Sequence, residues 1–127
     1  MSGELEQATR GFFDLLDRKD GEAMIGTLAE DAQSVDEISR RWLRGAHELG
    51  GYITQLVKQV EDVHTSISDV HEIVQGEIGI MTCWMEQDYV LEGKPQHVSA
   101  PTTMVFRRAS GGWKVLLFHS IPLPEEA

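Results

Sequence analysis

The sequence predicts an α+β domain in which helices close one side of a curved antiparallel sheet. The first observation is that the C-terminal part contains three strand-like runs, at residues 78–91, 96–108 and 113–121. The gaps between these runs are short and rich in glycine, proline and serine, which favours antiparallel hairpins. The second observation is that apolar residues before residue 61 recur at helical spacing. Helices followed by a meander of strands are the order expected of this class.

Three helices are expected in the N-terminal half. Residues 4–17 have apolar side chains at spacings of three and four, so one helical face carries Leu5, Ala8, Phe12, Leu15 and Leu16. Asp20 can begin a second, shorter helix before Asp31, because its side-chain oxygen can accept a hydrogen bond from a backbone N–H. A third helix should follow Gly45, since the same apolar spacing continues as far as Val60.

The remaining segments complete one domain. Residues 32–45 are long enough for two short strands that reverse near residues 38–41, and residues 63–74 predict a longer strand. With 127 residues, the chain has the length of one ordinary domain, so we expect a single domain over residues 1–127. Residues 122–127 contain two Pro and two Glu and are expected to form a loose C-terminal tail.

The charge of the chain limits its partners. Asp and Glu number 21 and Lys and Arg number 11, which gives a formal net charge of −10. Such a field repels a phosphate backbone or an anionic membrane, so we expect neither nucleic acid nor membrane as a partner. The single Cys83 cannot form an intrachain disulfide, which favours a buried thiol and a cytoplasmic location.

Several short motifs together resemble a known family. Two N-terminal helices lead into the segment LAEDA at residues 28–32, and Asp36 follows on a short strand. An RG pair at residues 44–45 opens the next helix, and the chain ends with GGWKV at 111–115 and HS at 119–120. This arrangement resembles the SnoaL-like and ketosteroid-isomerase-like members of the nuclear transport factor 2 (NTF2-like) superfamily. The resemblance implies a cone-shaped barrel in which three N-terminal helices pack on a curved antiparallel sheet.

The resemblance also implies a hollow interior, which members of the superfamily use for isomerisation, cyclisation, dehydration, ligand sensing or assembly. Asp36 stands where isomerases and some cyclases of the family hold the carboxylate that moves a proton beside a carbonyl group. Phe12 stands where the isomerases keep a tyrosine, and Thr102 stands roughly where they keep a protonated aspartic acid. Phe cannot donate a hydrogen bond to an oxyanion, and Thr is a weaker donor, so the known steroid isomerase constellation is incomplete.

Asp36 and Glu37 are neighbours in the sequence. Because adjacent residues of a strand point to opposite faces, at most one of them is expected to enter the interior. If Asp36 is the inward one, burial would make it a usable general base near neutral pH. The alternative is that both are solvated carboxylates of a turn.

His119 is the expected partner of Asp36. If the last strand alternates regularly, His119 shares a face with Trp113, Val115 and Leu117. A histidine on an apolar face either lines a cavity or is a core residue bonded to the backbone. In the first case, Asp36 and His119 could act as base and acid across the interior.

Further residues are candidates for binding a ligand. Trp84 and Glu86 share one face of their strand with Asp88, which predicts either a polar pocket mouth or a half-exposed surface. Met104 and Phe106 share a face with Thr102 and are expected to form pocket wall or core. Together with the residues above, the predicted ligand-binding set is Phe12, Trp42, Tyr52, Trp84, Glu86, Thr102, Met104 and Phe106. No metal site or cofactor is expected, because the histidines and Cys83 lack ligand-type spacing.

Two functional hypotheses follow. The first is a cofactor-independent isomerase, cyclase or dehydratase in which Asp36 is the base and His119 the acid. Its substrate would be an apolar or aromatic carbonyl compound enclosed by aromatic side chains. The second is a non-catalytic module that binds a hydrophobic ligand or assembles through its sheet. In either case the apolar run at residues 115–118 predicts a homodimer.

Overall fold

The computed structural model describes residues 3–124. Its helices are α1 (Glu4–Asp17), α2 (Gly21–Gly26) and α3 (Ala46–Gln59). Its strands are β1 (Leu28–Asp36), β2 (Leu43–Arg44), β3 (Val60–Gln75), β4 (Ile78–Leu91), β5 (Lys94–Ala109) and β6 (Gly112–Ser120). Within the tail expected at residues 122–127, residues 122–124 have no regular structure, and residues 125–127 lie outside the described part.

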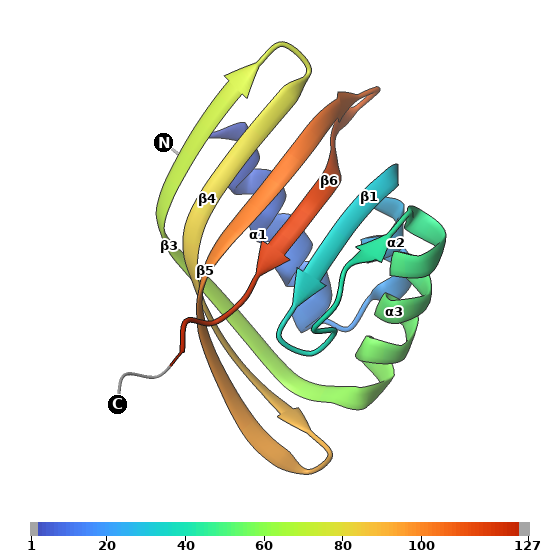
Figure 1. The fold of residues 1–127 in the computed structure, drawn as a ribbon, viewed down its shortest axis with the longest axis vertical. Helices are drawn as coiled ribbons and strands as arrows, with labels where there is room; N and C mark the ends of the chain where they lie inside the picture. Colours follow the sequence, from blue (N-terminus) through green and yellow to red (C-terminus); the bar gives the residue numbers. More distant parts are fainter. Residues whose placement is uncertain (1–2, 125–127) are drawn as a thin grey trace.

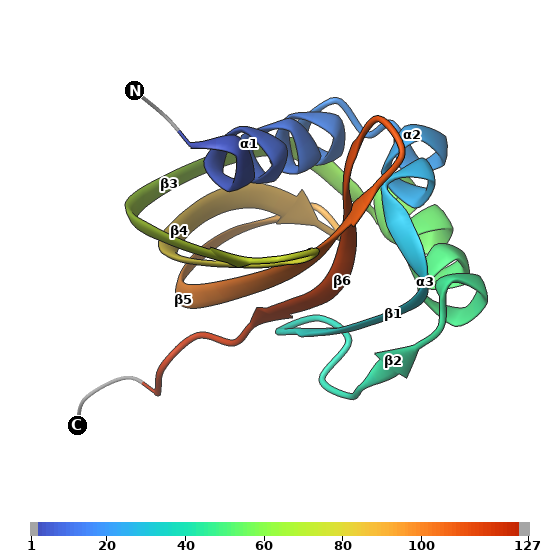
Figure 2. The ribbon, with the colours of Figure 1, turned by 90° about the horizontal axis from the view of Figure 1, so that it is seen from above.

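The six strands form one sheet in the order β2-β1-β6-β5-β4-β3. From β3 to β6 the pairing is antiparallel throughout, as the hairpins of the sequence predict. The pairing of β1 with β6 is parallel, however, so the sheet is mixed. The sheet is strongly curved and unclosed, and the helices cover its concave side (Figures 1 and 2). The α+β cone with its curved sheet is therefore confirmed, and the parallel pair of β1 and β6 is the one departure from the antiparallel pairing that was expected.

The N-terminus of helix α1 is hydrogen-bonded to β3, an edge strand of the sheet. The Glu72 carboxylate on β3 accepts hydrogen bonds from the backbone N–H groups of Leu5, at 3.0 Å, and Glu6, at 3.2 Å. These are N–H groups of the first helical turn, which lack partners within the helix. Leu5 is fully buried, and its side chain packs over the backbone of Gly79 on β4. The helix is thereby fixed across the concave face.

Helices α2 and α3 pack together beside β1. Asp20 caps α2 as expected, because its side chain accepts a hydrogen bond from Ala23 N at 3.1 Å. Helix α2 ends at Gly26, earlier than the sequence suggests, because Leu28 already pairs with β6. In α3, Gly50 is buried and faces the side chain of Ile25, where a Cβ atom would make ordinary van der Waals contact at 3.6 Å.

An irregularity in β6 determines which side chains face inward. Val105 of β5 pairs with Leu117, but the next residue of β5, Phe106, pairs with Val115. One extra residue of β6, Leu116, thus lies between two adjacent partners, which is the arrangement of a β-bulge. Beyond the bulge, Ser120 is buried, and the alternation of the strand is reversed relative to its first half.

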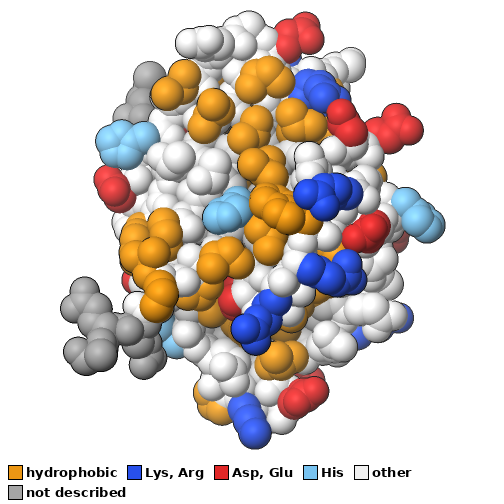
Figure 3. Space-filling model, viewed as in Figure 1, with side chains coloured by type: hydrophobic (Ala, Val, Ile, Leu, Met, Phe, Trp, Pro, Cys, Tyr) orange, Lys and Arg blue, Asp and Glu red, His pale blue; other side chains and the backbone are white. Residues whose placement is uncertain are grey.

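The outer face of the sheet is partly apolar. Figure 3 looks onto this face and shows a band of apolar side chains across it. Among the large apolar residues exposed on β3 and β4 are Ile73, Ile78 and Ile80. No helix among residues 3–124 is both long enough and apolar enough to cross a membrane.

Candidate functional site

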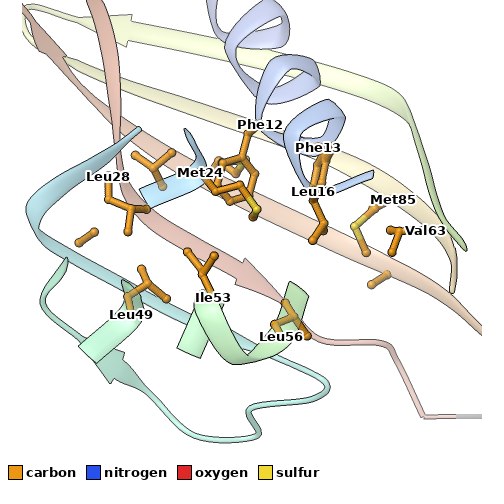
Figure 4. Close-up of a cluster of buried hydrophobic side chains, with 14 of the residues drawn as sticks. Phe12, Phe13, Leu16, Met24, Leu28, Leu49, Ile53, Leu56, Val63 and Met85 are labelled. Atoms are coloured by element: carbon orange, nitrogen blue, oxygen red, sulfur yellow. The ribbon is translucent and has the colours of Figure 1, made fainter. Parts of the chain in front are cut away.

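The concave face of the sheet and the three helices surround a cavity of about 60 Å³, which opens to solvent. Figure 4 shows its apolar wall, in which side chains of α1 point toward those of α3. The apolar residues labelled there all line the cavity: Phe12, Phe13, Leu16, Met24, Leu28, Leu49, Ile53, Leu56, Val63 and Met85. The lining is that of a site for a small, largely apolar molecule.

Asp36 lies at the polar end of this cavity, where β1 gives way to a turn. Its Oδ1 atom accepts hydrogen bonds from the backbone N–H groups of Ile38, at 3.0 Å, and Ser39, at 2.7 Å. The Asp36 N–H in turn donates to Ser39 Oγ at 3.0 Å. Aspartate commonly stabilises a turn through such bonds to the backbone two or three residues ahead. The local sequence therefore fixes the Asp36 side chain.

Tyr52 of α3 completes the surroundings of Asp36. Its hydroxyl lies 2.9 Å from Asp36 Oδ1 and 3.0 Å from Oδ2, and it donates its hydrogen to this carboxylate. Burial, followed by the negative charge of Asp36, raises the pKa of Tyr52 well above its usual value. The hydroxyl therefore keeps its proton and remains a donor to Asp36.

Glu37 also lines the cavity, next to Asp36. Burial, followed by the charge of Asp36, raises the pKa of Glu37 from 4.5 to about 7. Its own backbone N–H and the Tyr89 hydroxyl, 3.4 Å from Glu37 Oε1, act in the opposite direction. Burial and the charge of Glu37 raise the pKa of Tyr89 to about 12. Glu37 is thus a carboxyl group that changes its charge near neutral pH.

The structure brings both carboxyl groups into the same site. The expectation that only one of them enters was wrong, because β1 ends at Asp36 and Glu37 belongs to the following turn. The alternation of a strand therefore no longer applies between them. Of the predicted site residues, Asp36, Phe12 and Tyr52 line the cavity together.

His119 does not lie among the cavity residues. Regular alternation would place it on the face of Val115, but the bulge at Leu116 turns it to the outer face of the sheet. There its ring lies 5.9 Å from the ring of Trp42, centroid to centroid. Trp42 itself is 40% exposed and also lies outside the cavity. The prediction that His119 shares a face with Val115 was therefore wrong.

Trp84 and Glu86 also lie on the outer face, because the opposite face of β4 carries the buried residues. Trp84 Nε1 donates to Ser99 Oγ at 2.7 Å, and Ser99 Oγ donates to Glu86 Oε1 at 2.9 Å. His97 lies between Glu86 and Asp88, with nitrogen–oxygen distances of 3.0 and 2.7 Å. These polar residues link β4 to β5 outside the cone, so their assignment to the pocket is not supported by their position.

Thr102, Met104 and Phe106 are buried on the inner face but lie outside the set that lines the cavity. The Thr102 hydroxyl lies 2.8 Å from Ser120 Oγ, and Ser120 lines the cavity. Ser120 therefore lies between Thr102 and the cavity. Phe106 packs in the core under α1, where it also borders a separate surface depression.

Other polar residues of the site were not identified from the sequence. Tyr89 and Gln87 line the cavity from β4, and Ser34 lines it from β1. Gln87 Nε2 donates to Thr65 Oγ1 at 3.0 Å, so its amide is held by β3. The signal for Tyr89 and Gln87 was present, since both share a strand face with the apolar Met85, but the opposite face, with Trp84 and Glu86, was assigned to the pocket.

The charge of the cavity lining is entirely acidic. Asp36 and Glu37 are its charged side chains, and none of the described residues that line it is Lys, Arg or His. Nor do the described residues include a group of three or more His, Cys, Asp or Glu side chains arranged to hold a metal ion. The site as described offers an apolar body, two carboxyl groups and two tyrosine hydroxyls.

Comparison with known proteins gives one family and several similar folds. The model of a family described as SnoaL-like domain matches residues 5–124. None of the curated proteins compared with the chain matches it significantly. A dehydratase candidate of the NTF2-like family from Streptomyces avermitilis has a TM-score of 0.87 and 20% identity, with 96% of this chain and 95% of that chain covered.

Two other solved structures are similar. A ketosteroid isomerase-like protein from Erwinia carotovora has a TM-score of 0.79 and 17% identity, covering 96% of this chain and 95% of its own. An aromatic ring hydroxylase candidate from Novosphingobium aromaticivorans has a TM-score of 0.86 and 15% identity, covering 96% of this chain and 88% of its own. At these identities the likeness concerns the fold alone.

Proposed function

The chain belongs to the SnoaL-like family of the NTF2-like superfamily, and we propose that it binds a small apolar molecule and exchanges a proton with it without a cofactor. One observation carries the proposal. Two adjacent carboxyl groups, Asp36 and Glu37, form the polar end of a cavity that is otherwise mainly apolar. Carboxyl groups with different surroundings in one enclosed site are typical of acid–base catalysis.

The reaction class is an isomerisation, cyclisation or dehydration of a carbonyl compound. Each of these begins with the movement of a proton at a carbon beside a carbonyl group, which a carboxylate can perform when its pKa lies near the working pH. The pKa of Glu37, raised by burial to about 7, meets this requirement. The names of the dehydratase candidate and the ketosteroid isomerase-like protein favour the same class.

The ligand is expected to be neutral. The two carboxyl groups repel an anion, and no cation among the described lining residues offsets them. A neutral aromatic ketone such as β-tetralone should therefore bind, whereas an aromatic carboxylate of similar size, such as 2-naphthoate, should bind at least about ten-fold more weakly. Isothermal titration with both compounds at pH 8 measures this difference. Tighter binding of the carboxylate would contradict the assignment of the cavity.

Proton exchange with β-tetralone also tests the catalytic proposal. In D₂O, the wild-type protein should accelerate the incorporation of deuterium beside the carbonyl group, as followed by NMR. The double variant Asp36→Asn/Glu37→Gln should lose this activity by about 100- to 10,000-fold. Glu86→Gln, on the outer face, is the matched control and should leave the rate unchanged. Equal rates for the wild type and the double variant would refute acid–base catalysis at this site.

A second candidate function is ligand binding without catalysis. It is favoured by the missing oxyanion donors, because Phe12 forms part of the apolar wall and the Thr102 hydroxyl is bonded to Ser120. Both tyrosine hydroxyls in the site also donate to carboxylates. Binding of β-tetralone without any acceleration of its exchange would favour this candidate.

We also propose that two copies associate through the outer face of the sheet. Ile73 of β3 pairs with Ile80 of β4, and these two side chains are 58% and 39% exposed. Ile80 lies on the face of β4 opposite the buried residues, and exposed apolar side chains of this kind favour association. Light scattering should give twice the mass of the 14.2 kDa chain. Ile80→Lys should give the single-chain mass, and Gln55→Lys on the exposed side of α3 is its control.

A further inference from the structure

We propose that Glu37 carries the transferred proton, and that Asp36 is a fixed anion that positions this proton rather than the base itself. The assignment rests on the proposed function and divides the work between the two carboxyl groups. It departs from the expectation based on the sequence, which gave the role of base to Asp36. Three features of the site support it.

The first feature is the set of hydrogen bonds that the Asp36 carboxylate accepts. Oδ1 accepts hydrogen bonds from the backbone N–H groups of Ile38 and Ser39, at 3.0 and 2.7 Å, and lies 2.9 Å from the Tyr52 hydroxyl. Oδ2 lies 3.0 Å from the same hydroxyl. Donors to a carboxylate stabilise its charged form and hold it in place. The protein thus holds the Asp36 carboxylate in one orientation through three donor groups.

The second feature is that few side-chain donors among the described residues reach the Glu37 carboxyl group. Among the described residues, the side-chain donor to its carboxyl group is the Tyr89 hydroxyl, at the long distance of 3.4 Å. Glu37 therefore has lone pairs available for a proton from a bound molecule. It also lines a second depression, which Arg40, Ile121 and Pro122 border on the surface. Glu37 thus lies between the cavity and solvent, so it can exchange the proton that it takes up.

The third feature is the set of charges around Glu37. Asp36 of β1, Tyr89 of β4 and Tyr52 of α3 surround it within the site, and Arg40 shares the surface depression. Asp36 is the nearest anion, and its charge adds to burial in raising the pKa of Glu37 to about 7. Asp36 therefore acts through Glu37, because its fixed charge adjusts the proton affinity of its neighbour.

The proton transfer needs no other reactant. The Glu37 carboxylate removes a proton from the carbon beside the carbonyl group, and a new O–H bond forms on Glu37. The electron pair of the broken C–H bond forms a C=C bond, and the carbonyl π electrons move to oxygen, which gives an enolate. Protonated Glu37 no longer attracts the Tyr89 hydroxyl as an anion, so this hydroxyl becomes available to the enolate oxygen. Glu37 then returns a proton to carbon, and its charge is restored.

The experiment compares single variants in the β-tetralone exchange assay at a series of pH values. The wild-type rate should rise with pH through a midpoint near 7, the value to which the pKa of Glu37 is raised. Glu37→Gln should lower the rate by about 100- to 10,000-fold. Asp36→Asn should lower the rate by no more than about ten-fold and move the midpoint about one pH unit lower, because the neighbouring negative charge is removed. A purely structural role of Asp36 would leave the midpoint in place.

The reverse result would overturn the assignment. If Asp36→Asn abolished exchange and Glu37→Gln retained it, Asp36 would be the base and the proposed function would stand. If the wild type gave no exchange at all, the proposed function and the assignment would both fail. Circular dichroism checks that each variant folds. The ¹³C NMR titration of the Glu37 carboxyl group in the wild type provides a test that needs no variant, and a midpoint near 4.5 would also overturn the assignment.

Discussion

Glu37→Gln is expected to stabilise the protein above neutral pH, although it removes a group of the proposed site. The folded-state pKa of Glu37 is raised from 4.5 to about 7, so folding favours the protonated form. Between these two pH values the folded state binds a proton that the unfolded chain releases, and the free energy of unfolding falls as pH rises. At about 1.4 kcal/mol for each pH unit, this interval corresponds to about 3 kcal/mol. Gln is neutral at every pH and avoids this loss.

Urea denaturation of the wild type and Glu37→Gln between pH 4.5 and 9 measures the effect. The two proteins should have similar free energies of unfolding near pH 4.5, and the variant should be more stable by up to about 3 kcal/mol above pH 8. Glu30→Gln, at an exposed position of β1, is the control and should follow the wild type. A constant difference between wild type and Glu37→Gln across this range would refute the burial of a titrating Glu37.

Two further pairs of variants test the hydrogen bonds of the two tyrosines and the packing at two glycines. Tyr52→Phe should lower the free energy of unfolding by about 1.5–3 kcal/mol, because it removes a donor to a charged group. Tyr89→Phe should lower it by less than about 1 kcal/mol, because the hydrogen bond from Tyr89 to Glu37 is long. Equal losses on urea denaturation would contradict this ranking. A Cβ atom at Gly79 would lie 2.7 Å from Leu5 Cδ1, so Gly79→Ala should cost about 1–3 kcal/mol. Gly51→Ala, whose Cβ meets nothing within 4 Å, should raise the free energy of unfolding by up to about 1 kcal/mol. An unchanged melting temperature for Gly79→Ala would show that α1 does not pack as described.

The parts of the fold that depend on local sequence could be predicted. Asp20 caps its helix, and the hairpins of β4, β5 and β6 form at the expected turns, because turns and caps are determined by a few adjacent residues. The parallel pairing of β1 with β6 joins segments far apart in the chain. No local pattern indicates which distant strand will be a neighbour, so this pairing could not be predicted from the hairpins alone.

The site was predictable only where side-chain direction follows from a regular element. Phe12 lies on the apolar face of a regular helix and was placed correctly in the interior. His119 was misplaced because one extra residue, Leu116, reverses the alternation of side chains along β6. Nothing in the identity of Leu116 marks it as the site of a β-bulge. Glu37 was set aside because the end of β1 could not be located to within one residue.

The central position of β6 has a consequence for how the chain folds. β6 is the last of the six described strands in chain order, and it lies between β1 and β5. Until it emerges, the segment with β1 and β2 has no sheet partner in the segment with β3, β4 and β5, and both leave strand edges unpaired. The whole sheet therefore cannot be completed before β6 has been synthesised. A chain truncated before Gly112 should remain in two unjoined parts and aggregate, even though it retains Asp36, Glu37, Tyr52 and Tyr89.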